Sequence, residues 1–445
     1  MRAAKPPFYS RIAVASAVGA TLGLLGATAA HAAPSASEKS IVAAVKTQQE
    51  PSIKLLEQVV NINSGTMNFA GVRAVADVFR PRFEALGFKA AWVDGASFGR
   101  AGHLVAEHKG KSAKARHILL IGHLDTVFEP DSPFQKFERT TDANIVKGPG
   151  TCDMKGGIVV ALAALTALKQ TGALDNLHIT FVMHGDEESA GRPLQLARKT
   201  LIDSAEAADV AIGLENAADD PATAVTARRS SGGWELKVKG RSAHSSQIFT
   251  DEVGAGAIYE MARILNSFYT ELHAEEFLTF NPGLAIGSTQ VEFVAEPLQA
   301  KASGKDNIVA PVAVASGDLR AISPQQIQQT QERMRKIVAD HLPQTSAEIT
   351  FDDSYPPMAP SAGNDKLLGI FDEVSRDLGF GPVKAVNPRR AGAADISFAA
   401  DHVEMSIDGL GLLGGGNHTP KEFADLRTLQ IQAQRLGVLM YRLGK

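Results

Sequence analysis

The sequence predicts an α/β fold that carries a separate α+β domain inserted in its second half. Two short apolar runs, Ile118–Ile121 and Ile179–Met183, are each followed by acidic or imidazole side chains, as expected for buried strands. Between them, Gly157–Lys169 has apolar residues at helical spacing. The inserted domain is indicated by the strict alternation of residues 234–239, which is typical of a sheet with one solvated face.

The other elements follow from the same patterns in chain order. Ahead of the central block we expect helices at 38–60 and 71–86, a strand at 89–93, and a hairpin of strands at 103–107 and 117–122. After it we expect a strand at 210–214, then strands at 234–239, 286–294, 312–319 and 347–351 with helices at 254–272 and 324–341. Helix and strand alternate again from 364, and an amphipathic helix at 426–443 ends the chain.

Two helices against four alternating strands favour an α+β sandwich for the inserted part. We therefore expect four segments, which are a signal peptide at 1–32, a first catalytic part at 33–225, the inserted domain at 226–345 and a second catalytic part at 346–445.

The N-terminus has the pattern of an export signal. Arg2, Lys5 and Arg11 precede an Ala/Gly/Val/Leu-rich run at 12–25, and Ala30-His31-Ala32 fits the small-x-small cleavage rule. The mature protein is then periplasmic or secreted, with a retained membrane anchor as the alternative. No later run is long and apolar enough to span a bilayer, so we expect no stable membrane insertion after cleavage.

The amino-acid composition and net charge indicate which partners the protein is not expected to bind. The chain has 445 residues, of which 44% are apolar, enough for a sizeable core. Without the first 32 residues, 42 basic residues stand against 49 acidic ones, a net charge of −7. That balance argues against nucleic acid or an anionic membrane as a partner. Cys152 is the single cysteine, so no intramolecular disulfide forms, and we expect it to pack as a small buried residue.

Side chains at the ends of the predicted strands form a candidate metal site. Because ligands in α/β sheets bind outside the carboxyl ends of the strands, these side chains can converge there. Carboxylate oxygens and imidazole nitrogens are the donors that zinc and similar ions take. The candidate ligands are His123, Asp153, Glu188, Glu215 and His418.

Four further residues of these motifs have expected roles at the site. Asp125 could accept the second N–H of the His123 ring and fix its tautomer. Glu187 adjoins Glu188, so one can bind metal while the other acts as general base. Lys155 and Asp186 are interpreted as supports rather than reactants. Taken singly, each motif is more often structural than catalytic, but together at three strand ends they favour catalysis.

The blocks GHLDTV, GPGTCDMKGG, MHGDEES, GLENA and GGGNHTP resemble those of the dizinc aminoacylase/carboxypeptidase family, in particular its glutamate carboxypeptidase (carboxypeptidase G) type. The resemblance covers roughly residues 40–445. It implies a dizinc exopeptidase catalytic domain, with a mixed sheet between helices, and an inserted ferredoxin-like lid domain through which two subunits commonly dimerise.

The resemblance also implies a role for each matched residue. It gives two zinc ions, or cobalt or manganese in their place, held by His123, Asp153 as bridge, Glu188, Glu215 and His418. Glu187 becomes the general base on a metal-bridging hydroxide, and Asp125 the acid that supports a ligand. His244 matches the lid histidine that reaches the partner subunit's site and stabilises the oxyanion. Asn307 and Arg320 match the lid residues that hold a substrate carboxylate, a task for which the planar fork of arginine is suited.

One departure from the family concerns the substrate. Close relatives carry Gly-Gly-Thr-Asp before a late helix, whereas Ala391–Asp395 has no threonine and follows Arg389 and Arg390. Glutamate is therefore not assumed as the residue released. The expected function is hydrolysis of the amide bond to a C-terminal amino acid in small peptides or N-acyl amino acids.

Three alternatives to this function stay open. An N-acyl amino acid deacylase or an aminopeptidase can use the same core. A single-metal hydrolase would leave His418 as a loop residue only. The remote alternative is a non-catalytic periplasmic peptide-binding protein.

Overall fold

The computed structural model describes residues 33–445, except 113, 217–219 and 296–297. The expected signal peptide at 1–32 lies outside the described residues. Among the helices of the described part, none has both the length and the apolar character needed to cross a bilayer.

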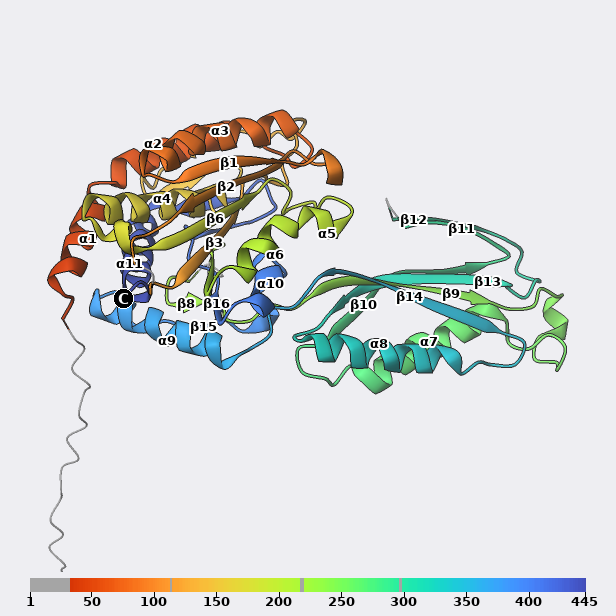
Figure 1. Ribbon diagram of the computed structural model, residues 1–445. Coiled ribbons are helices and arrows are strands. Elements are labelled where there is room, and N and C mark those ends of the chain that lie inside the picture. Colours follow the sequence, from red (N-terminus) through yellow and green to blue (C-terminus); the bar gives the residue numbers. More distant parts are fainter. Residues whose placement is uncertain (1–32, 113, 217–219, 296–297) are drawn as a thin grey trace, which may run out of the picture. The chain divides into compact units, whose positions relative to one another are not determined.

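A mixed six-stranded sheet forms the first core (Figure 1). Its strands, in spatial order, are β1 (Lys89–Asp94), β2 (Gly102–His108), β6 (His178–His184), β3 (His117–His123), β7 (Val210–Gly213) and β16 (Met405–Ile407). The pairs β6/β3, β3/β7 and β7/β16 are parallel, and the pairs on the β1 side are antiparallel. The expected hairpin between β2 and β3 is wrong, because β6 lies between them and pairs with both.

Both faces of this sheet are buried, which confirms the expectation of a mixed sheet between helices. In β3, Ile118 and Leu120 join one apolar cluster, while Leu119 and Ile121 join another on the opposite face. The first cluster includes α4 (Lys155–Gln170), most of whose residues are buried. Helices α1 (Ala36–Lys46), α2 (Gln49–Val60), α3 (Phe69–Ala85), α9 (Ala362–Asp377) and α11 (Leu426–Leu443) pack in this cluster, and α6 (Lys199–Glu206) and α10 (Ile396–Ala399) pack in the other.

A capping box and an ion-pair chain attach the first helix to the last. The backbone N–H of Ser35 donates to Glu38 Oε2 at 2.7 Å, and the Ser35 hydroxyl caps α1 in return. The other oxygen of Glu38 accepts from Arg442 Nε at 2.8 Å, and Arg442 also bonds Asp377 of α9 at 2.7 Å. The two ends of the described chain are therefore joined directly.

The inserted segment forms a second sheet with its own apolar core (Figure 1). Its elements in chain order are β9 (Ser231–Lys239), α7 (Gly256–Leu272), β10 (Thr279–Ser288), β13 (Val312–Arg320), α8 (Pro324–Ala339) and β14 (Ser346–Tyr355). The spatial order β10-β13-β9-β14, antiparallel throughout, is the ferredoxin-like arrangement. The domain boundaries given above stay predictions.

The strand expected at 286–294 is wrong in its extent. β10 ends at Ser288, and a separate hairpin follows, made of β11 (Gln290–Val294) and β12 (Gln299–Ser303). The apolar positions change phase at this break, from Leu284 and Ile286 to Val291 and Phe293.

A small antiparallel sheet brings two glycine-rich loops together. Its order is β17 (Gly414–Gly415), β18 (Phe423–Asp425), β5 (Ile145–Lys147) and β4 (Glu138–Arg139). The loop between β5 and α4 therefore lies beside the loop between β17 and β18, and Gly148 N–H donates to the Glu422 carbonyl at 3.4 Å. Other short elements include α5 (Leu194–Ala197) and the parallel pair β8 (Thr223–Ala224) and β15 (Lys384–Ala385).

Candidate active site

Three side chains converge at the carboxyl ends of the parallel strands. His123 ends β3, Glu215 follows β7, and Asp153 lies in the loop that leads into α4. His123 Nε2 is 3.4 Å from Asp153 Oδ1 and 3.3 Å from Glu215 Oε1. That nitrogen is buried and in hydrogen-bond geometry with neither oxygen. One ligand atom from each residue lies within 4.8 Å of the others, which suits three donors around one metal ion.

A second group shares Asp153 with the first. His418 Nε2 is 3.1 Å from Asp153 Oδ2 and 3.1 Å from Glu188 Oε2. His418 has a positive φ of 60°, a conformation that L-residues adopt rarely and that aims its ring at the two carboxylates. The two oxygens of Asp153 are thus divided between the two groups, as a bridging ligand requires.

The electrostatics of the cluster fit bound cations. Burial, together with repulsion from the negative charge of Asp153, raises the pKa of Glu215 to about 7. Burial also raises the pKa of Glu188. Burial lowers the pKa of His123, but the carboxylates around its ring outweigh burial and raise that pKa well above the usual range. Hydrogen bonds to Asp153 and Glu188 raise the pKa of His418 to about 11. Carboxylates this close together repel one another and bind protons more readily. A bound divalent cation removes that repulsion and lets them stay ionised, so these imidazole and carboxylate donors fit two metal ions.

The loop after β6 places Glu187 beside the ligand Glu188. The N–H groups of Glu187 and Glu188 donate to the two oxygens of Asp125, each at 3.1 Å. Asp125 also accepts from the Thr66 hydroxyl at 2.7 Å. The His123 ring, however, has Nδ1 3.0 Å from the backbone carbonyl of Asp125 and 3.5 Å from its carboxylate. The Asp125 side chain therefore organises the Glu187 loop, and its backbone fixes the ring.

Two supports of Asp153 were missed by the sequence reasoning. Glu422 accepts from the backbone N–H groups of Gly150, Cys152 and Asp153 at 3.0 to 3.2 Å. Asn417 donates to Asp153 Oδ2 at 3.1 Å. Asn417 stands next to His418 in the motif and could have been found there, whereas Glu422 follows a lysine in a loop and carries no signal. Cys152 itself is buried, as expected.

A buried ionic network stands behind the Glu187 loop. Arg198 is fully buried and contacts Asp186 Oδ1 at 2.8 Å and Asp395 Oδ1 at 2.9 Å. His184 Nδ1 pairs with the other oxygen of Asp395. Lys155, also fully buried, donates to two carbonyls at the end of α2, Val59 and Ile62, at 3.0 Å each. Asp186 is thus tied to Asp395 through Arg198, and Lys155 ties the start of α4 to the end of α2, while their role as supports of the site stays a prediction.

The three lid candidates lie in the inserted segment rather than in the acidic cluster, with Arg320 on a strand of its sheet and His244 and Asn307 between strands. His244 forms an isolated bridge with Ile308, and Ser245 N–H donates to the carbonyl of Asn307 at 2.9 Å, so His244 and Asn307 are neighbours. Arg320 ends β13, and its Nε donates to Asp318 at 3.0 Å.

A cavity of about 260 Å³ opens onto the acidic cluster. Asp153, Glu187 and Glu215 are among the residues that line it. Arg228 and Arg390 line it too, and Arg228 is held by Asp408 at 2.9 Å. The cavity therefore combines metal-binding acids with guanidinium groups.

Fold and site together define a hydrolase with a two-metal centre. The chain belongs to peptidase family M20/M25/M40, whose model matches residues 119–442. It is 25% identical to carboxypeptidase G2 of Pseudomonas sp. (strain RS-16) over 451 residues, covering 98% of this chain and 99% of that protein. A succinyl-diaminopimelate desuccinylase of Methylocella silvestris is 35% identical over 79 residues, 17% of this chain and 20% of that protein.

Solved structures share the fold. The aminopeptidase PepT from Bacillus cereus superposes with a TM-score of 0.71 at 18% identity, covering 89% of this chain and 99% of that one. The YXEP protein of Bacillus subtilis, described as a dinuclear metal-binding peptidase, gives a TM-score of 0.63 at 17% identity, with 89% and 98% covered. By family the protein is a metallohydrolase of peptide or amide bonds.

Proposed function

We propose that this protein is an exported dizinc carboxypeptidase that releases the C-terminal amino acid from small peptides or N-acyl amino acids. The division of the two Asp153 oxygens between two ligand groups, with Glu187 on the adjoining loop, is the observation that carries this proposal. The end-to-end similarity to carboxypeptidase G2 supports the direction of cleavage.

His123, Asp153 and Glu215 would hold one metal ion, and Asp153, Glu188 and His418 the other. Zinc suits this mixture of imidazole and carboxylate donors, with cobalt or manganese as substitutes. When bound, the pair supplies Lewis acidity that polarises the scissile carbonyl and acidifies the attacking water.

Glu187 moves the proton. Its carboxylate takes a proton from the attacking water and returns it to the leaving amine, the usual work of a general base that becomes a general acid. His244 donates to the oxyanion, and a donor of this kind can contribute about 3–4 kcal/mol.

Arg320 and Asn307 hold the carboxylate of the residue released. Arg229, just ahead of β9, donates from Nη1 to the hydroxyl of Thr279, and Thr279 is the register partner of Arg320, so Thr279 neighbours both arginines. Burial, together with repulsion from Arg320 and Arg389, lowers the pKa of Arg229. Positive charges gathered in this way favour an anionic group on the substrate.

His244 would reach the metals either from a partner subunit or by a large lid closure, and we propose the first, in a homodimer through the β9–β14 domain. Helix α7 of that domain exposes Ile258, Tyr259 and Tyr269, and the nearby Phe249 contacts Tyr259. Such exposed apolar residues on one helix are typical of an interface. Export through residues 1–32 would place this dimer in the periplasm or outside the cell.

The deciding experiment is hydrolysis by the purified mature protein before and after chelation. The panel contains N-acyl and peptidyl amino acids with C-terminal Glu, Asp, Phe, Leu or Arg, next to free-amine tripeptides. Chelator-sensitive release of the C-terminal residue is expected. Cleavage of the tripeptides from their N-termini alone would establish an aminopeptidase, and peptide binding without hydrolysis or metal would establish a binding protein.

A further inference from the structure

In each of the two peptide groups that flank Glu187, both the N–H and the carbonyl oxygen are hydrogen-bonded to a side chain. Asp125 accepts the two N–H groups. At the carbonyl ends, Arg198 Nη2 donates to the Asp186 oxygen at 3.1 Å, and the Tyr355 hydroxyl donates to the Glu187 oxygen at 2.9 Å. Because the peptide groups are planar, four such bonds fix the direction in which the Glu187 side chain leaves the backbone.

Of these side chains, Tyr355 comes from the second sheet. It is the last residue of β14 and pairs with Ser231, the first residue of β9. The chain enters the second sheet at Ser231 and leaves it at Tyr355. A side chain at the exit of that sheet therefore bonds directly to the loop that carries the general base.

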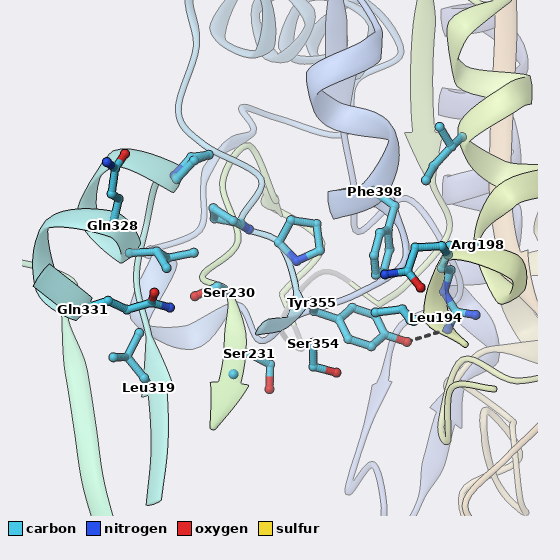
Figure 2. Close-up of a pocket in the computed structure, with 17 residues that line it drawn as sticks. Leu194, Arg198, Ser230, Ser231, Leu319, Gln328, Gln331, Ser354, Tyr355 and Phe398 are labelled. Atoms are coloured by element: carbon cyan, nitrogen blue, oxygen red, sulfur yellow. Dashed lines mark hydrogen bonds between the residues drawn. The ribbon is translucent and has the colours of Figure 1, made fainter. Parts of the chain in front are cut away.

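The Tyr355 hydroxyl is held in place from the other side as well. Arg198 Nη2 donates to it at 2.6 Å, and the tyrosine ring packs edge-on against Phe398 with centroids 4.9 Å apart (Figure 2). Since Arg198 is fully buried between Asp186 and Asp395, the donor to this hydroxyl has a fixed position.

A cavity lies next to the hydrogen bond between Tyr355 and Arg198. The cavity, of about 530 Å³, is lined by residues 230–232 and 354–357, the two chain connections into the second sheet, and by Arg198 and Phe398 (Figure 2). The end of β14 therefore borders open space on this side rather than close-packed side chains.

We propose that Tyr355 is a positioning residue that couples the β9–β14 domain to Glu187, so that the general base is aligned only when the end of β14 is in place. The coupling rests on the proposed function of Glu187. Arg320, the arginine proposed to bind the substrate carboxylate, lies on β13 of the same sheet. Binding of that carboxylate would therefore affect the alignment of Glu187 through the end of β14.

Tyr355→Phe tests the coupling because it removes the hydroxyl and keeps the ring against Phe398. We expect kcat to fall about 10- to 100-fold, since a misplaced catalytic group costs that much, with KM within about twofold and both metal ions retained. Hydrogen exchange of the Glu187 and Glu188 amides should rise about tenfold, because their loop loses one of its holds. Tyr441→Phe, on α11, is the matched control and should change none of these quantities.

Each other outcome has a defined meaning. A kcat within twofold of the wild type, a loss confined to KM, or a loss of metal together with activity would overturn the coupling. If Tyr355→Phe did not accumulate as folded protein, Phe398→Leu would replace it, because that change loosens the tyrosine ring without removing a bond to Glu187. A wild-type protein that hydrolyses no member of the panel would instead overturn the proposed function.

Discussion

Asp153 places one carboxylate oxygen 3.4 Å from His123 Nε2 and the other 3.1 Å from His418 Nε2. A single residue therefore belongs to both ligand groups, and replacing it should affect both metal ions at once. In Asp153→Asn the amide keeps one neutral oxygen and loses the negative charge that two cations would share. We expect metal content near zero after dialysis and activity lower by about 10³-fold or more. Metal analysis by mass spectrometry, with the panel assay, checks this. Retention of two ions would contradict the bridging role.

The variant His418→Ala distinguishes a two-metal centre from the single-metal alternative. The change removes a ligand from the second group and leaves His123, Asp153 and Glu215 intact. We expect metal content to fall from about two ions to about one per chain, with kcat lower by about 10²-fold or more. Full activity with one ion bound would establish a single-metal hydrolase.

Glu187→Gln keeps the shape of the side chain and removes its ability to take a proton. We expect a folded, metal-loaded protein whose kcat is lower by about 10²- to 10⁴-fold, the usual contribution of a general base. Metal content and thermal unfolding serve as internal controls, because neither should change. Near-normal kcat would rule out Glu187 as the base.

Arg320→Gln should weaken binding more than chemistry. The substrate carboxylate loses a charge-assisted partner, so we expect KM to rise about tenfold or more with a smaller change in kcat. A substrate whose terminal carboxylate is amidated should show no such difference between variant and wild type. Arg376→Gln, on the surface of α9, is the matched control. Equal effects on the acid and amide substrates would contradict the assignment.

Glu38 should make stability depend on pH. Burial raises its pKa, but bonds from Arg442 and Ser35 outweigh burial, and the pKa lies below its usual value. The stabilisation is therefore present above the ordinary glutamate pKa and is lost as pH falls through the lower folded pKa. Glu38→Gln should lower the free energy of unfolding by about 2 kcal/mol at pH 7, as charged hydrogen bonds do. Denaturant unfolding of metal-free protein should show this difference shrinking below about pH 4.5. A difference that stays constant with pH would show that the charge of Glu38 contributes nothing.

Local signals explain which parts of the site could be anticipated. His123, Glu187 and Glu188 stand within a few residues of strand ends, so the apolar runs that predict the strands also place these side chains. Sheet order is different, because the insertion of β6 between β2 and β3 depends on pairing between distant segments. Periodicity within a segment carries no information about that partner.

The supports of the site were the hardest part to predict. Glu422, Arg198 and Tyr355 are single polar residues in segments without a motif, and each acquires its role from groups far away in the chain. Glu422 bonds to backbone N–H groups about 270 positions earlier, and Tyr355 to a carbonyl 168 positions earlier. Only the folded chain brings such pairs together.

The loop between β17 and β18 also has a consequence for biosynthesis. It supplies His418 and Glu422, which are translated more than 200 residues after Asp153 and Glu188, the residues that they contact. A nascent chain that ends before β17 carries neither the second ligand group nor the support for the loop of Asp153. On the proposed function, a chain truncated before β17 is therefore expected to be inactive toward peptides.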